Sequence, residues 1–276
     1  MGLNYRRFGR GPVLVLQHGF LGGSGYFAPL MTTLGHTNDV VAPDLPGFAH
    51  SANEGVAESI EAYSRAQVEL LDSLGIDKFS ILGHSMGGMI SLQTTLDNPD
   101  RVEKLVLYAT ASSGELPGRF ETFDETLEKV RTQGVKNVAE NVVASWFYRR
   151  QQDPMYPLCM ESAEAATSEA VSASLKAFSH WNVTHRLSEL DLPTLVIAGD
   201  KDRSYHLSGI IELAGNIKDA QLCLLPQGAH CVHLEKPAVF SSIVQEFMIS
   251  KQDGNPAPGN YSSHHEAVPE FRYCKI

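Results

Sequence analysis

The stretch FSILGHSMGG, residues 79–88, decides how this chain folds. Its first four residues form a short, mostly apolar run that ends at Gly83, as a buried strand does, and a helical pattern begins after Ser85. Ser85 has a glycine two positions to either side, which is the G-x-S-x-G pattern of a nucleophile elbow. A Cβ atom at Gly83 or Gly87 would crowd so sharp a turn. The pattern therefore predicts a strand, a turn that exposes the serine hydroxyl, and a helix from Met86 whose dipole favours negative charge nearby.

Strand and helix patterns alternate on both sides of this stretch. Most of the apolar runs lack polar alternation, as strands buried on both faces do, and the helical windows repeat apolar residues at helical spacing. This alternation predicts an α/β fold, namely a mostly parallel, doubly wound sheet with helices on both faces. The other predicted strands are residues 13–16, 39–42, 105–109, 194–198 and 221–225, and the predicted helices are residues 59–74, 86–96 and 237–249.

Residues 112–181 interrupt the alternation, because they contain helical windows and no strand pattern. A segment of this length is too long for a simple loop, so we expect an inserted helical cap above the end of the sheet. The core would then comprise residues 1–111 and 182–250, and the turn-rich residues 251–276 are expected to be a flexible C-terminal tail. The helical windows of the cap are residues 120–133, 135–147, 156–165 and 169–179.

Two polar loops follow later strands in the chain order that a serine-based triad requires. The sequence GDKD at residues 199–202 offers two aspartates, and the sequence PQGAHCVHLEKP at residues 226–237 offers two histidines. The carboxyl ends of parallel strands open onto one crevice, so these loops can reach Ser85. An imidazole there can take the serine proton while a carboxylate holds its tautomer. From the residues alone, the acid can be Asp200 or Asp202 and the base can be His230 or His233.

These motifs resemble those of α/β-hydrolase-fold serine hydrolases, and the resemblance extends over roughly residues 3–250. Besides the elbow and the two loops, it rests on the turn His18-Gly19 after the first strong strand and on the sequence DLPG at residues 44–47. The family pattern implies that the acid is Asp202 and that the base is His230. It also implies a helical cap.

The same resemblance implies an oxyanion hole made of two backbone N–H groups, those of Phe20 and Met86. It implies no metal and no organic cofactor. The chain departs from the family pattern at two positions, where Ala49 and Ala229 stand in place of the usual glycines. We expect altered loop geometry at these positions and retained activity.

The serine nucleophile narrows the chemistry that the resemblance implies. It argues against the branches of the fold that use Asp or Cys, and it predicts cleavage of a carboxylic ester or lactone through an acyl-enzyme. One alternative is a hydrolase of carbon–carbon bonds in ring-cleavage products, a branch that usually has Trp where this chain has Leu234. A second alternative is a ligand-binding receptor on the same fold, against which the full set of glycines around Ser85 argues.

Composition limits the partners and the compartment. The chain has 22 basic and 32 acidic residues and a net charge of -10, which disfavours nucleic acid as a partner. No apolar stretch is long enough for a membrane helix, and the N-terminal residues lack a secretion signal. The four cysteines are scattered without ligand spacing, so we expect reduced thiols, no metal site and a cytoplasmic location. The expected partner is a small ester or lactone; the oligomeric state is open.

Overall fold

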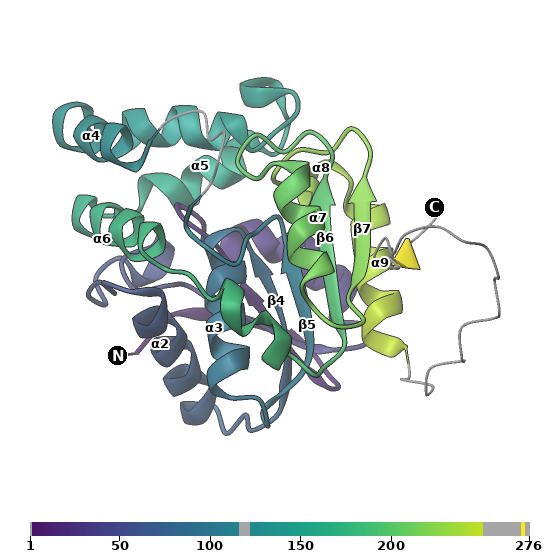
Figure 1. The fold of residues 1–276 in the computed structure, drawn as a ribbon. Coiled ribbons are helices and arrows are strands. Elements are labelled where there is room, and N and C mark those ends of the chain that lie inside the picture. The colour runs from purple at the N-terminus through teal and green to yellow at the C-terminus, as the bar shows by residue number, and fades with distance from the viewer. Residues whose placement is uncertain (1, 116–121, 251–271, 274–276) are drawn as a thin grey trace.

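A computed structural model describes residues 2–115, 122–250 and 272–273. Its centre is one sheet in the order β1-β3-β2-β4-β5-β6-β7-β8, in which β1 runs antiparallel to β3 and all other pairs are parallel (Figure 1). This arrangement confirms the predicted mostly parallel sheet. The strands are β1 Tyr5–Gly9, β2 Val13–Gln17, β3 Asp39–Pro43, β4 Phe79–His84, β5 Val102–Tyr108, β6 Thr194–Gly199, β7 Gln221–Leu225 and β8 Arg272–Tyr273.

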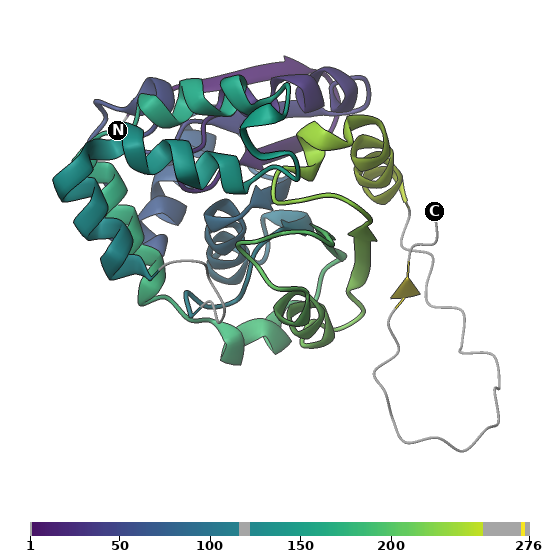
Figure 2. The ribbon, with the colours of Figure 1, turned by 90° about the horizontal axis from the view of Figure 1, so that it is seen from above.

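Helices cover both faces of the sheet, as a doubly wound fold requires. Helices α1 and α9 pack together on one face, and α2 and α3 pack together on the other, where α7 also lies against β6 and β7 (Figure 2). The strands between them are therefore buried on both sides, and their central residues are fully shielded from solvent. The bounds are α1 Ala28–Leu34, α2 Ile60–Ser73, α3 Met86–Asp97, α7 Leu207–Gly215, α8 Val232–Glu235 and α9 Pro237–Ile249.

Three helices follow β5 and lie above the carboxyl ends of the strands (Figure 1). They are α4 Phe123–Ser145, α5 Tyr156–Glu164 and α6 Ser168–Ser179. Helix α4 is interrupted at Gly134, whose φ of 81° and ψ of 163° are not helical, at the boundary between the two predicted windows. Phe120, at the start of the first window, and most of the predicted tail lie outside the described residues.

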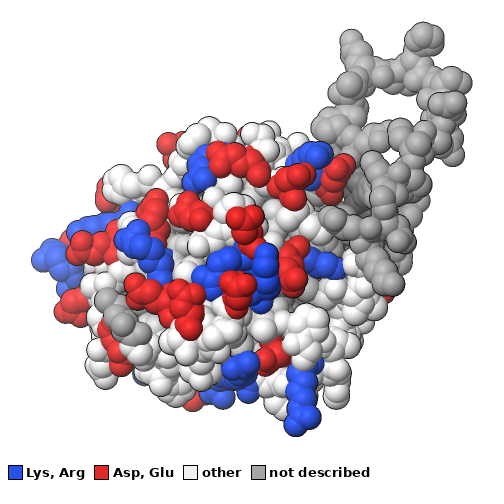
Figure 3. All heavy atoms as spheres, turned by 90° about the horizontal axis from the view of Figure 1, so that it is seen from below, with Lys and Arg blue, Asp and Glu red and all other residues white. Residues whose placement is uncertain are grey.

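The surface opposite these three helices carries both signs of charge. Figure 3 shows basic and acidic side chains interleaved over this face. Ion pairs such as Arg101–Asp72, with 2.8 Å between nitrogen and oxygen, bring the two signs into contact. In the part of the chain that the structure describes, no helix combines the length and the apolar character needed to cross a membrane.

Candidate active site

Ser85 occupies a sharp turn between β4 and α3. Its φ of 59° and ψ of −126° are unusual for a residue with a side chain, and such strain is typical of functional sites. The two flanking glycines are required by contact: a Cβ atom at Gly83 would collide with the carbonyl oxygen of Gly87, and one at Gly87 with that of Gln17. The predicted turn between strand and helix is therefore present, and Ser85 is partly exposed to solvent.

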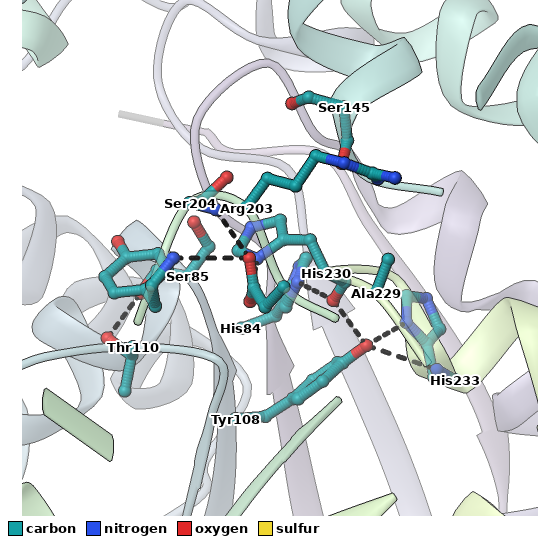
Figure 4. A network of polar contacts seen from close by, with 12 residues as sticks. His84, Ser85, Tyr108, Thr110, Ser145, Arg203, Ser204, Ala229, His230 and His233 are labelled. Carbon is teal, nitrogen blue, oxygen red and sulfur yellow. Dashed lines mark hydrogen bonds and ion pairs between the residues drawn. The ribbon is translucent and has the colours of Figure 1, made fainter. Parts of the chain in front are cut away.

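The elbow is held by the end of the neighbouring strand. The backbone N–H of Ser85 donates to the carbonyl oxygen of Tyr108 at 2.9 Å, and the Thr110 hydroxyl donates to the carbonyl oxygen of Ser85 at 2.7 Å (Figure 4). Thr110 was not predicted from the sequence, because nothing in its own neighbourhood marks it. Its role depends on a contact across 25 positions of the chain.

The structure brings Asp202 and His230 together. His230 Nδ1 lies 2.8 Å from Asp202 Oδ2, and both side chains are buried. The other oxygen, Asp202 Oδ1, accepts the backbone N–H groups of Ser204 at 2.7 Å and Tyr205 at 3.2 Å. Because the carboxylate accepts at both oxygens, the ring hydrogen of His230 belongs on Nδ1, and Nε2 is left to accept a proton.

The alternative acid and base lie elsewhere. Asp200 forms an ion pair with the neighbouring Lys201 at 3.2 Å, and it has no contact with His230 among the described hydrogen bonds. His233 is fully buried, with its Nδ1 3.0 Å from the Tyr108 hydroxyl, and burial lowers its pKa to about 3. A histidine that stays neutral under such burial is a poor general base, so the geometry favours Asp202 and His230.

The turn that contains Phe20 lies directly against the elbow. A Cβ atom placed on Gly19 would lie 2.8 Å from the Cβ of Ser85 and 3.1 Å from the backbone nitrogen of Met86. Only glycine allows the turn to approach the elbow this closely. The Phe20 ring packs edge-on against Phe178 of α6, with 5.9 Å between ring centroids.

His18 stabilises this turn. Its Nδ1 donates to the carbonyl oxygen of Gly19 at 2.8 Å, and its Nε2 accepts the backbone N–H of Leu45 at 2.8 Å. Burial lowers the pKa of His18, more than the nearby Asp44 carboxylate raises it, which keeps the ring neutral with one donor and one acceptor. Both of its ring nitrogens are therefore used within the protein.

The two positions that depart from the family pattern differ in their backbone. Ala49 has a φ of 45°, in the left-handed region that favours glycine. Ala229 has no such conformation and is fully buried. Its N–H donates to the Glu235 carboxylate at 2.6 Å, so an alanine fits there without backbone strain.

A cavity of about 220 Å³ lies next to the site, and Ser85, Asp202 and His230 are not among its lining residues. It is lined by Thr110, by Ser204 and by Tyr205, whose ring stacks on that of His230 at 5.6 Å between centroids. Its wall combines the apolar Ala111, Ile210 and Leu213 with hydroxyl groups. No Lys or Arg occurs among the described lining residues, and the acidic ones are Glu115 and Glu212. The hydroxyl-bearing residues of the wall also include Ser112, Ser113, Thr184 and Ser208.

Both loops of the acid and base hold the same short segment after α4. Arg203 donates to the carbonyl oxygen of Phe147 at 2.9 Å, and the N–H of Cys231 donates to that of Trp146 at 2.9 Å. Glu235 accepts the N–H of Tyr148 at 2.6 Å on one oxygen and that of Ala229 on the other. Burial raises the pKa of Glu235 despite these two hydrogen bonds. Only Glu235 had a sequence signal, as part of the histidine-loop motif.

Comparison with known proteins agrees with this architecture. Residues 12–237 match the family model described as alpha/beta hydrolase fold, so the chain belongs to the α/β hydrolase family. Among solved structures, the enol-lactonase from Burkholderia xenovorans superposes with a TM-score of 0.81 at 24% identity, covering 90% of this chain and 96% of that one. This likeness supports the fold.

Within the described residues, no group of three or more His, Cys, Asp or Glu side chains is placed to hold a metal ion.

Two curated relatives have different activities in their names. "Putative carbamate hydrolase RutD" of Agrobacterium fabrum is 26% identical over 244 residues, covering 86% of this chain and 93% of that protein. The 2-hydroxy-6-oxo-6-phenylhexa-2,4-dienoate hydrolase of Comamonas testosteroni is 26% identical over 268 residues, covering 89% and 91%. Both are hydrolases, and the protein is a hydrolase of this family.

Proposed function

We propose that this protein hydrolyses a carboxylic ester or a lactone through an acyl-enzyme on Ser85. The observation that carries the proposal is the buried pair of Asp202 and His230 beside an elbow whose geometry only glycines permit. In this proposal, Ser85 is the nucleophile, His230 the general base and Asp202 the residue that orients it. The backbone N–H groups of Phe20 and Met86 form the oxyanion hole.

The reaction proceeds in two halves. His230 Nε2 takes the Ser85 proton as the serine oxygen attacks the carbonyl carbon, and the negative charge that develops on the carbonyl oxygen is received by the two N–H groups. Asp202 stabilises the imidazolium, which then protonates the leaving alkoxide. Water, deprotonated by His230, attacks the acyl-enzyme in the same way and releases the acid. Every proton in the cycle is carried by His230.

We propose that the substrate extends into the cavity beside the triad. Ser85, Asp202 and His230 do not line this cavity themselves, and its lining favours an uncharged group. It is bordered by the partners of all three triad residues, since Thr110 holds Ser85, Ser204 holds Asp202 and Tyr205 stacks on His230. Its hydroxyl groups suit a neutral polar group. Its two carboxylates outnumber the single imidazole, that of His206, which disfavours an anion. A dienoate, as in the name of the Comamonas relative, carries a carboxylate. Ester or lactone cleavage is therefore favoured over carbon–carbon bond cleavage.

We further assign residues 112–181 to a cap over a core made of residues 1–111 and 182–250. Support comes from α4, α5 and α6, which lie above the carboxyl ends of the strands where Ser85, Asp202 and His230 are placed (Figure 1). The ring of Phe178 on α6 against Phe20 would let the cap limit substrate size. The buried cysteines Cys159, Cys223 and Cys231 are compatible with work in the reducing cytoplasm.

The test is hydrolysis of p-nitrophenyl esters from acetate to decanoate by the wild type and by Ser85→Ala, together with labelling by a fluorophosphonate. Ser73→Ala on α2, remote from the site, is the matched serine control. We expect wild-type and Ser73→Ala turnover with a short-chain optimum and none with Ser85→Ala. Labelling of Ser85 without turnover of any ester or lactone would instead favour the diketone substrates of carbon–carbon hydrolases. Absence of labelling would favour a receptor.

A further inference from the structure

Behind the pair of Asp202 and His230 lie four buried polar rings that the proposed mechanism does not use. They are Tyr26, His84 at the end of β4, Tyr108 at the end of β5 and His233 in α8. None of them is more than 2 % exposed. His84 is central among them. Its ring lies 4.4 Å from that of Tyr108 in a stacked arrangement and 4.5 Å from that of His230, measured between centroids.

Two of these side chains converge on one atom, the backbone carbonyl oxygen of His230. His84 Nε2 lies 3.0 Å from it and the Tyr108 hydroxyl lies 2.8 Å from it (Figure 4). A carbonyl oxygen only accepts, so both side chains donate. This oxygen belongs to a loop residue, and a buried carbonyl without a donor is costly. Among the described hydrogen bonds, the carbonyl oxygen of His230 is thus bound by side chains and by no backbone N–H of a strand or helix.

The tautomer of His84 follows from the same contact. Burial lowers the pKa of His84 well below that of a free histidine, with further lowering by the neighbouring His230 and His233, so the ring is neutral and carries one hydrogen. That hydrogen is on Nε2, facing the carbonyl of His230. Nδ1 is then an acceptor, and the Tyr26 hydroxyl, 2.9 Å away, donates to it.

The hydrogen bonds continue from Tyr26 to the turn on the other side of the serine. The Tyr26 hydroxyl oxygen accepts the backbone N–H of Gly19 at 3.3 Å, and Gly19 precedes Phe20. A continuous path thus joins the loop of the proposed base to the turn of the proposed oxyanion hole. Its centre is His84, the residue directly before Ser85.

We propose that His84 is a positioning residue that holds His230 and the Phe20 turn in fixed places relative to Ser85. The proposal rests on the proposed function, because it concerns the alignment of that triad and that oxyanion hole. His84 itself touches neither the substrate nor a moving proton. Its two ring nitrogens serve the two halves of the site separately, Nε2 the base and Nδ1 the oxyanion turn.

Two amide variants separate these roles. In His84→Gln the longer side chain can place its NH₂ group near the position of Nε2, which keeps the donor to His230 and loses the acceptor for Tyr26. In His84→Asn the shorter side chain can place its oxygen near Nδ1, which keeps the acceptor and loses the donor. His84→Phe removes both. Leu71→Val, a buried change on α2 outside this network, controls for a loss of stability.

The readouts are the rate of Ser85 labelling by a fluorophosphonate and kcat and KM for p-nitrophenyl acetate, with the melting temperature recorded for each variant. We expect His84→Asn and His84→Phe to lower the labelling rate and kcat by about tenfold or more with KM unchanged, as the loss of an aligning hydrogen bond would. His84→Gln, which loses only the bond toward the Phe20 turn, should lower both by about threefold. Tyr26→Phe should lower both at least as much as His84→Gln, because it breaks the same hydrogen bond and also removes the acceptor of the Gly19 N–H.

The outcomes separate this proposal from the function on which it rests. Wild-type protein that neither reacts with the fluorophosphonate nor cleaves the ester would remove the proposed function itself. Wild-type protein that reacts, together with His84→Asn and His84→Phe that react equally fast, would overturn the role of His84. The role of His84 would also be overturned if the losses of labelling rate and kcat in all His84 variants merely paralleled their lower melting temperatures, and if Leu71→Val showed the same losses at the same melting temperature.

Discussion

Gly19 is a residue at which the turn of the proposed oxyanion hole meets the elbow. An added Cβ atom would lie 2.7 Å from the carbonyl oxygen of His84 and 2.8 Å from the Cβ of Ser85. The carbonyl oxygen of His84 belongs to the backbone, and the Cβ of Ser85 is fixed by the backbone. The turn that contains Gly19 must therefore move instead. We expect Gly19→Ala to lower kcat for p-nitrophenyl acetate by about 10², the cost of losing one oxyanion donor.

The same loop provides the control for this prediction. Gly25→Ala would place its Cβ atom 3.6 Å from the Ser162 hydroxyl, which is an ordinary contact, and Gly25 has no positive φ. This variant should keep kcat near the wild-type value. Equal activity of Gly19→Ala and Gly25→Ala would show that the turn does not supply a donor.

Buried neutral histidines make the stability depend on pH. His233 has a pKa of about 3 in the folded protein, against an ordinary value of 6.5, because burial disfavours its charged form. Below pH 6.5 the unfolded chain binds a proton there that the folded chain does not bind. The contribution of His233 to the free energy of unfolding is therefore fully present above pH 6.5 and is lost as the pH falls toward 3. His18 and His84, whose pKa values are also lowered, act in the same direction.

This dependence is measured by urea unfolding at pH 7, 6 and 5. The free energy of unfolding should decrease as the pH decreases. In His233→Asn this decrease between pH 6 and pH 5 should be smaller by about 1 kcal/mol per pH unit. Glu235 acts in the opposite direction, because its pKa is raised in the folded state. Identical slopes for wild type and His233→Asn would contradict a neutral His233.

Among the elements, the segment after α4 is attached to the rest of the chain by Glu235. One carboxylate oxygen accepts from Tyr148 and the other from Ala229, each at 2.6 Å. Hydrogen bonds to a charged, partly buried group are stronger than neutral ones. We expect Glu235→Ala to lower the free energy of unfolding by about 2 kcal/mol, with a smaller loss for Glu235→Gln, which keeps one acceptor.

Urea unfolding and ester turnover together check this prediction. Glu246→Ala, which removes an exposed carboxylate on α9, should leave both quantities unchanged. Because the same carboxylate borders the histidine loop, Glu235→Ala should also lower kcat. A loss no larger than that of Glu246→Ala would mean that the attachment contributes little.

Sequence patterns predicted the elements whose burial follows a regular period. Helix α9 has the predicted bounds, and Gly134 separates the two predicted windows within α4. Strand β1 was not predicted, because it is an edge strand with mostly exposed residues and so lacks an apolar pattern. Helices α1 and α7 are short, and α7 contains a glycine, so neither had a clear window.

The candidate site divides in the same way. Ser85 was identified from its own motif. The residues alone left two aspartates and two histidines open, and Asp202 and His230 were selected by the resemblance to the family. Tyr26 could not be identified, because its contact with His84 joins positions 58 residues apart and depends on the folded backbone. The contacts that orient the proposed triad are thus a property of the structure, whereas the motifs that contain its residues are readable along the chain.

For the whole molecule, the interior protects the thiols. Cys159, Cys223 and Cys231 are all buried, and burial raises the pKa of Cys231 well above the usual value, which disfavours the reactive thiolate. In a Cys274→Ser variant, which removes the cysteine outside the described residues, a maleimide should therefore label almost no thiol in native protein. After unfolding in urea it should label three. Rapid native labelling of any of them would contradict this packing.

The order of the strands along the chain determines when the protein can become active during its synthesis. The proposed nucleophile follows β4 and the proposed base follows β7, and 146 positions separate His84 from the His230 carbonyl that it binds. A nascent chain that has released its elbow from the ribosome still lacks every residue able to activate the serine. Catalysis can begin only when the C-terminal third has been translated and its strands have docked, so regain of turnover in a refolding experiment would report completion of the sheet.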